Sequence, residues 1–208
     1  MPNDDPWSDA QRLESWAGEV RVNLIRAAGL VAFYGYHLIN FFGLNEEVRG
    51  RFHAAVTAIV LVWAFVILLL HVCLLRRYVP AGLKYFSTAA DLVLITAMLI
   101  LTRDGPHSPL MLLYFLVIAS APLRLSLPLV YVATLGSMAA GLVLVGYQYF
   151  FLIGPESYYQ SNERIPHTVQ VICFLSLGTA GILAGQMVRQ ARRLVEGYSV
   201  AVDKPVEK

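Results

Sequence analysis

Charged residues are scarce in this chain of 208 residues: they make up 14% of it, against 57% for hydrophobic residues. A soluble domain usually carries about 25% charged residues. The deficit is concentrated in several long apolar runs, which argues against an ordinary soluble domain. The runs are far longer than the roughly 10 residues of a barrel strand and do not alternate in polarity, so they predict helices. We therefore expect an all-α, polytopic integral membrane protein.

Several other features are missing. Cys73 and Cys173 are the only cysteines, and the helical rise places them at different depths, too far apart for a disulfide. The acidic N-terminus is unlike a basic, apolar secretory leader, so we expect none. No hydrolase elbow, P-loop, dinucleotide fingerprint or zinc-finger pattern is present, which favours a protein without enzymatic activity. The basic residues are spread over the loops, so no nucleic-acid partner is expected.

Six apolar segments predict a domain of six transmembrane helices over residues 22–188, at about 22–44, 52–75, 83–101, 108–123, 126–152 and 167–188. The fourth segment is the shortest. Its apolar residues 110–123 cover only about 21 Å at the helical rise, against about 30 Å of hydrocarbon. We therefore expect this helix to begin within the preceding loop.

Both ends of the chain are more polar than the spans. Residues 1–21 predict a tail and an amphipathic helix lying in the membrane interface, because Leu13, Trp16 and Val20 lie on one face. A solvent helix packed on a partner is the alternative. Residues 189–208 predict a helical extension of the last span and a disordered tail. The extension keeps an apolar seam through Met187 and Ala191, typical of a short coiled coil or a partner-docking helix.

Lysine and arginine are unevenly divided between the two sides of the membrane. With six spans, both termini lie on one side, and that side carries most of these cations. The other side holds only Arg49, Arg51, Arg103 and Arg164. The positive-inside rule then predicts that both termini are cytoplasmic.

Three ionisable residues lie inside the predicted spans near the cytoplasmic side: Arg26, His71 and Asp91. Each is about 6 to 11 Å from its helix end by the helical rise. Such groups are costly in lipid and are usually paired or functional. An ion pair of Asp91 with Arg26, joined by His71, would form a clamp between three spans. A proton relay or gating switch, or an Arg26 that snorkels to the interface, are alternatives.

The other four histidines fall in one layer near the outer side: His37, His53, His107 and His167. Asn40 and Tyr147 share that layer, and the loop from Gly105 to Pro109 carries His107. Interfacial or hydrogen-bonded histidines are the simplest interpretation. A proton- or ligand-sensing pocket is the second, and haem or another metal on His37 and His53 is the third. Aromatic residues in the same layer predict an interfacial belt, although a quinone or a lipid headgroup could use the same rings.

The last span carries Gly178, Gly181 and Gly185. The spacing of the last two is a GxxxG pattern, which lets two helix backbones approach closely. We expect helix packing inside the bundle, with a homodimer as the alternative.

Four segments together resemble the membrane input domain of bacterial sensor histidine kinases, of the redox-responsive type. They are Asp91-Leu-Val-Leu-Ile-Thr-Ala, a Gly-x-x-Ser-Pro loop, Tyr114-Phe-Leu-Val-Ile-Ala and Leu123-Arg-Leu-Ser-Leu. Gly105 and Pro109 match a G-G-x-x-N-P-F loop that the family uses in quinone sensing. The resemblance implies a six-span domain in the bacterial inner membrane, with a cytoplasmic signalling protein or catalytic domain as its partner. The kinase segments themselves are absent.

These observations favour a non-enzymatic sensory module in the lipid bilayer, which detects a membrane or periplasmic cue and transmits it through the last helix. The alternative is an accessory subunit of a membrane redox complex that binds quinone or haem. A small transporter is less favoured, because the spans show no inverted repeat.

Overall fold

A computed structural model describes residues 6–43, 50–76, 80, 82–102, 108–153 and 167–202; its side chains are described within 16–42 of the first helix and 168–194 of the last. The elements are α1 (Pro6–Gly43), α2 (Gly50–Leu75), α3 (Leu83–Leu101), η2 (Pro109–Met111), α4 (Leu112–Ser120), η3 (Ala121–Arg124), α5 (Leu127–Tyr147), η4 (Gln148–Ile153) and α6 (His167–Val202). Every regular element among these residues is helical, which confirms the predicted all-α fold.

Five of the described helices are long and apolar enough to cross a membrane. They contain Trp16–Phe42, Gly50–Leu75, Leu83–Leu101, Leu127–Phe151 and Thr168–Leu194. Many large apolar side chains on them are exposed, among them Leu24, Phe65 and Leu183, as expected of surfaces that face lipid. The chain therefore has the composition and the helix lengths of a multi-pass membrane protein.

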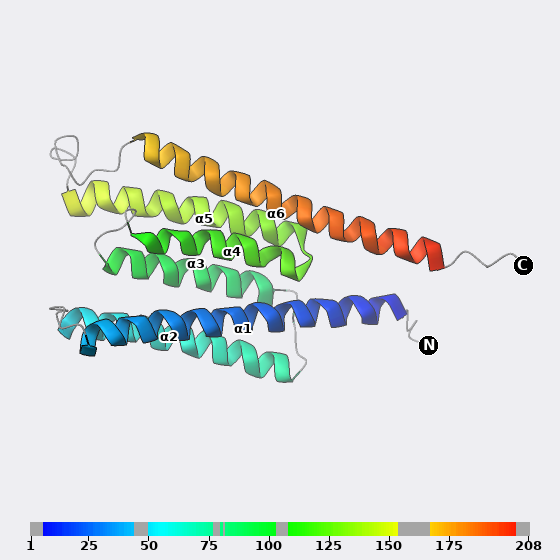
Figure 1. Ribbon diagram of the computed structural model, residues 1–208, viewed down its shortest axis with the longest axis horizontal. Helices are drawn as coiled ribbons and strands as arrows, with labels where there is room; N and C mark the ends of the chain where they lie inside the picture. Colours follow the sequence, from blue (N-terminus) through cyan, green and yellow to red (C-terminus); the bar gives the residue numbers. More distant parts are fainter. Residues whose placement is uncertain are drawn as a thin grey trace, which may run out of the picture.

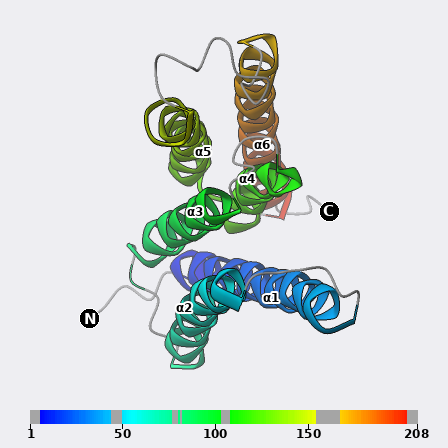
Figure 2. The same cartoon turned by 90° about the vertical axis from the view of Figure 1, so that its left-hand side faces the viewer.

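The helices run side by side in a bundle, and α1 begins at the same end at which α6 finishes (Figure 1). Seen from the opposite end, α3 and α4 lie between the α1–α2 pair and the α5–α6 pair (Figure 2). Contacts follow this order, because α1 packs on α2, α2 on α3, α3 on α5 and α5 on α6. We call the end with the start of α1 and the finish of α6 the inner end, and the opposite end the outer end.

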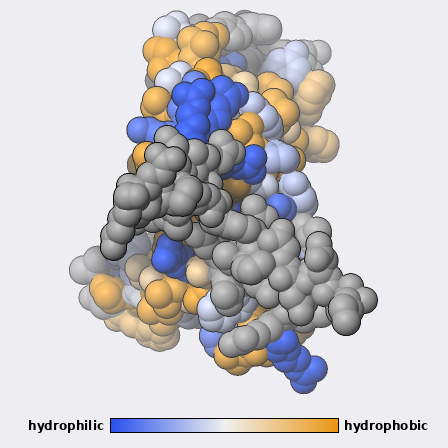
Figure 3. Space-filling view, turned by 90° about the vertical axis from the view of Figure 1, so that its right-hand side faces the viewer, coloured by the Kyte–Doolittle hydropathy of each residue, from blue (hydrophilic) through white to orange (hydrophobic). Residues whose placement is uncertain are grey.

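Two apolar clusters fill the bundle. The larger lies among α3, α4, α5 and α6 and includes the fully buried Leu99, Tyr114 and Leu129. The smaller lies among α1, α2 and α3 around Val56 and Met98. α3 contributes to both clusters, so it is the central element of the bundle. On the face at the inner end, hydrophilic residues lie among hydrophobic ones (Figure 3).

The first helix differs from the prediction. Residues 1–21 were expected to form a separate helix in the membrane interface, but α1 is one unbroken helix from Pro6 to Gly43. Its early residues pack on the bundle: the Trp16 Nε1 donates to the Leu74 carbonyl at 3.0 Å. Gly18 lies against η3, where a Cβ would come within 2.4 Å of the Leu123 carbonyl oxygen. The absence of a side chain at Gly18 therefore allows α1 to continue along the bundle instead of turning aside.

The fourth apolar segment forms only a short helix, as the small number of its apolar residues predicts. The Pro109–Arg124 stretch is the shorter apolar helix of the described chain, and it is divided into η2, α4 and η3. It begins where the Ser108 Oγ accepts from the Leu110 amide at 3.3 Å, beside a proline that suits a first helical turn. It ends at Leu125, whose φ of 48° is left-handed. That conformation is rare for a residue with a side chain, and it turns the chain sharply into α5.

The last helix continues beyond the bundle, as the sequence predicts. α6 runs without a break from His167 to Val202. The exposed Met187 and Leu194 lie on it.

Candidate functional site

The main polar feature of the bundle is a set of four buried charged residues near the inner end: Glu19, Arg26, Asp91 and Arg124. We call this set the inner charge cluster. It contains two acids and two bases, so its charges balance. Glu19 and Arg26 lie two turns apart on α1, about 10 Å by the helical rise, and each meets its own partner. The cluster therefore has two levels.

The deeper level is the ion pair of Arg26 with Asp91. The Arg26 Nε donates to the Asp91 Oδ2 at 2.6 Å, and Nη2 also contacts that oxygen. The other carboxylate oxygen, Oδ1, accepts from the Trp63 Nε1 at 3.2 Å. Both charged side chains are only 7% exposed. Asp91 thus joins α1, α2 and α3, and its pairing with Arg26 is the one expected from their depths.

His71 is not part of this cluster. The structure places it on an exposed face of α2, and the indole of Trp63 occupies the position on Asp91 that was expected for the imidazole. The reason is angular: Trp63 and His71 lie eight residues apart on one helix, and at 100° per residue they point about 80° apart. The predicted clamp between three helices is present, with tryptophan in place of histidine.

The second level is built around Arg124, at the end of η3. Its Nη1 donates to the Lys84 carbonyl and to the Thr88 Oγ1, each at 3.0 Å, and its Nη2 donates to the Ser87 Oγ at 3.2 Å. Its Nε lies 3.2 Å from the Glu19 Oε1, although not in line for a hydrogen bond. Arg124 therefore fixes η3 to the first turns of α3 and to α1.

Sequence reasoning missed Glu19, Trp63 and Arg124. Glu19 lies in the segment predicted as an interfacial helix, and Arg124 directly follows the fourth predicted span, so neither was considered among the charges inside the spans. Trp63 lies in an unbroken apolar run, where its polar N–H has no partner visible in the sequence. The available indication for Glu19 was the glycine before it, because small residues permit close helix crossings.

At the outer end, two of the four predicted histidines meet. The His37 Nε2 and the His53 Nδ1 are 3.0 Å apart, so one ring donates a hydrogen bond to the other. The rings are stacked, with centroids 5.2 Å apart, and Phe41 stacks on His53 at 3.9 Å. We call His37 and His53 the outer histidine pair. Asn40 lies one turn further along α1, with a buried side-chain oxygen that has no hydrogen-bond partner among the described residues.

The remaining residues of the predicted outer pocket do not join this pair in the part of the chain that the structure describes. Tyr147 lies on α5, where its ring stacks on Phe151 with centroids 5.6 Å apart, and α5 packs on α3 and α6. Pro109 is exposed at the start of η2. Gly105 and His107 lie outside the described residues, and so does the side chain of His167. Tyr147 therefore has no described contact with the outer histidine pair, while its grouping with His107 and His167 stays a prediction.

The three glycines of α6 differ in their surroundings. A Cβ on Gly181 would lie 2.3 Å from the Thr134 Oγ1 of α5, whereas at Gly178 and Gly185 nothing comes within 4 Å. Gly181 therefore serves packing inside the bundle. Gly178 and Gly185 line a groove between α5 and α6, with Arg189 near its inner end.

The chemistry open to these sites is ionic and hydrogen-bonding. The described residues contain no group of three or more His, Cys, Asp or Glu side chains that could hold a metal ion. Cys73 and Cys173 are free thiols. Breaking a buried ion pair is costly, about 3 to 5 kcal/mol, so the inner charge cluster is a strong positional constraint on the helices that it joins.

Comparison of the chain with known protein families, with curated proteins and with solved structures finds no match. The resemblance of residues 85–130 to sensor input domains stays a prediction.

Proposed function

We propose that the chain is a non-enzymatic sensory module of the bacterial inner membrane, which passes a membrane or periplasmic cue through α6 to a cytoplasmic signalling partner. The observation that carries the proposal is the continuity of α6 from His167 to Val202. A rigid helix that enters at the outer end and extends past the inner end can transmit a shift or a rotation along its length.

Two contacts connect α6 to the turn between η3 and α5 and to the beginning of α5. The Arg192 Nη2 donates to the carbonyl of Leu125 at 3.1 Å, and the Arg189 Nη2 donates to the Tyr131 hydroxyl at 3.2 Å. The neighbour of Leu125 is Arg124, which is bound to α1 and α3. A movement of α6 therefore acts on a junction that the inner charge cluster holds in place, and two discrete positions of α6 would constitute the switch.

The proposed sensing end is the outer one, where the imidazole nitrogens of the outer histidine pair offer a hydrogen-bond donor and acceptor to a ligand. The proposed topology has six spans, with the Pro109–Arg124 stretch as the fourth. Both termini are then cytoplasmic, as the positive-inside rule predicts.

Distances between spin labels test the transmission. In nanodiscs, labels on Arg193 of α6 and Arg76 after α2 should report a changed distance when the pH is shifted from 8 to 5 or when a short-chain quinone is added. A second pair on Arg76 and Leu83, at the adjoining ends of α2 and α3, is the control and should not change. An unchanged distance from Arg76 to Arg193 under all of these conditions would refute the transmission. A Soret absorption band in the purified protein would instead favour the haem-binding subunit.

The topology has its own test. Cysteines at Arg49, Asp104 or Glu163, in a variant lacking Cys73 and Cys173, should react with an impermeant thiol reagent from outside. Cysteines at Arg77 or Lys204 should react only after the cells are opened. The reverse pattern would place the termini outside and would remove the cytoplasmic partner from the proposal.

A further inference from the structure

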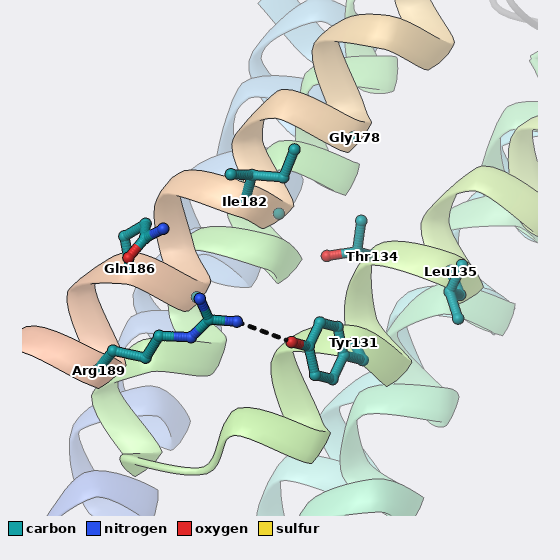
Figure 4. Close-up of a pocket in the computed structure, with 9 residues that line it drawn as sticks. Tyr131, Thr134, Leu135, Gly178, Ile182, Gln186 and Arg189 are labelled. Atoms are coloured by element: carbon teal, nitrogen blue, oxygen red, sulfur yellow. Dashed lines mark hydrogen bonds between the residues drawn. The ribbon is translucent and has the colours of Figure 1, made fainter. Parts of the chain in front are cut away.

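The groove between α5 and α6 has two chemically different ends. Its volume is about 200 Å³, below the roughly 300 to 1,000 Å³ of sites for drug-sized ligands. One end is apolar and is lined by Leu135, Gly178 and Ile182; the other is polar and is lined by Tyr131, Gln186 and Arg189. Figure 4 shows Arg189 reaching from α6 toward Tyr131 of α5 at the polar end. A narrow ligand with an apolar chain and an anionic head fits this gradient.

The length and depth of the groove agree with one leaflet of a bilayer. Gly178 and Arg189 are eleven positions apart on α6, or about 16 Å by the helical rise, and half of the hydrocarbon core is about 15 Å. Arg189 lies about 33 Å along α6 from His167, close to the roughly 30 Å thickness of the hydrocarbon core. With His167 at the outer boundary of the hydrocarbon, Arg189 falls at the inner boundary. The apolar end of the groove is then at the bilayer midplane and its polar end at the headgroups.

The groove opens outward, toward lipid. Leu135 is 66% exposed, Ile182 67% and Tyr131 51%. Gly178 and Gly185 have no side chains that could fill the groove. A Cβ at either position would meet nothing within 4 Å, so the space beside both glycines is open. Gly181, the other member of the GxxxG pattern, is already occupied by Thr134 of α5. This use of Gly181 inside the bundle disfavours a second copy of the chain as the occupant.

Arg189 has capacity for an anion. Its described hydrogen bond to the Tyr131 hydroxyl uses one nitrogen, whereas a guanidinium has five N–H donors arranged to bind phosphate. Arg192 follows almost one turn later on the same helix and is also exposed. Basic residues between transmembrane helices at the headgroup level are typical of anionic lipid sites.

We propose that the α5–α6 groove binds one anionic phospholipid, with an acyl chain along Gly178 and Gly185 and its phosphate on Arg189. A lipid held there would touch both α5 and α6, so its presence would favour the packing of these helices seen here.

Native mass spectrometry of the full chain, released from nanodiscs with equal amounts of phosphatidylglycerol and phosphatidylethanolamine, tests the proposal. We expect the wild type to retain phosphatidylglycerol preferentially. Arg189→Gln should lower that retention roughly fivefold, while Arg189→Lys should preserve most of it. The matched control is Arg193→Gln, which removes a charge from the same helix outside the groove and should change little.

Filling the groove is the second arm. Gly178→Leu should reduce phosphatidylglycerol retention, whereas Gly35→Leu, at an equally open position on α1, should not. Equal retention of the two lipids by the wild type would overturn the proposal. So would an unaltered preference in both Arg189→Gln and Gly178→Leu, or a dimer that Gly178→Leu abolishes, since the occupant would then be a second copy.

Discussion

The inner and outer ends of the bundle hold their buried polar groups in different ways. At the inner end, charged side chains join α1, α2, α3 and η3 through the pairs Arg26–Asp91 and Glu19–Arg124. At the outer end, the hydrogen bond of His37 with His53 stays within the α1–α2 hairpin. An ion pair in a low dielectric fixes its partners strongly, while a single neutral hydrogen bond contributes about 1 kcal/mol. The inner end is thus a fixed frame, and the outer end can rearrange at modest cost.

The largest expected effect comes from removing the deeper ion pair. Asp91→Leu leaves Arg26 buried without its counter-charge, and we expect a loss of about 3 to 5 kcal/mol in the free energy of unfolding. Titration of the purified protein from mild detergent into dodecyl sulfate, followed by circular dichroism, measures this loss. The double variant Arg26→Leu/Asp91→Leu should recover a large part of it. A loss below about 1 kcal/mol in the single variant would show that the inner end is not the rigid frame.

A smaller effect is expected where α1 crosses η3. Gly18→Ala places a Cβ against the Leu123 carbonyl oxygen, and the forced separation should cost about 1 to 3 kcal/mol in the same measurement. Gly29→Ala is the matched control on the same helix, because its Cβ would meet nothing within 4 Å. It should be neutral or stabilise the protein by up to about 1 kcal/mol. Equal effects of the two substitutions would mean that the crossing at Gly18 is not tight.

The smallest effect belongs to the outer end. His53→Phe keeps a ring to stack on Phe41 but removes the hydrogen bond to His37, so we expect a loss of only about 0.5 to 1.5 kcal/mol. His71→Phe, on an exposed face of α2, is the control and should change the free energy of unfolding very little. A loss of 3 kcal/mol or more in His53→Phe would make the outer end as firmly held as the inner end and would weaken the proposed sensing role.

The helices were largely predictable because long apolar runs in lipid leave few alternatives to a helix. The segment predicted over residues 83–101 coincides with α3, and the expected continuation of the last span appears in α6. The unbroken α1 was not predictable. Its continuity depends on Gly18 fitting against a carbonyl of η3, more than a hundred residues later in the chain, and no local pattern encodes that contact.

The candidate site was predictable in part for the same reason. The depth of a charge can be estimated from its position in a span, and depth alone suggested Asp91 with Arg26. The direction in which a side chain points around its helix depends on which helices are neighbours. That is why His71 was placed in the cluster and Trp63 was overlooked, and why Tyr147 of α5 was grouped with His37 and His53, which lie on the α1–α2 pair.

The long separation of the ion-pair partners along the chain has a consequence for biogenesis. Asp91, the partner of Arg26, lies 65 residues further along the chain. Arg124, the partner of Glu19, is separated from it by a still longer stretch. During synthesis from the N-terminus, α1 therefore emerges with two charges whose partners do not yet exist, and isolated charges are costly in lipid. Its apolar stretch also has the lowest mean hydropathy of the five long ones, 1.2. We expect α1 to wait near the membrane surface until α3 and η3 have been made. α1 would then be made before α3 and η3 but would take its place in the bilayer only after them.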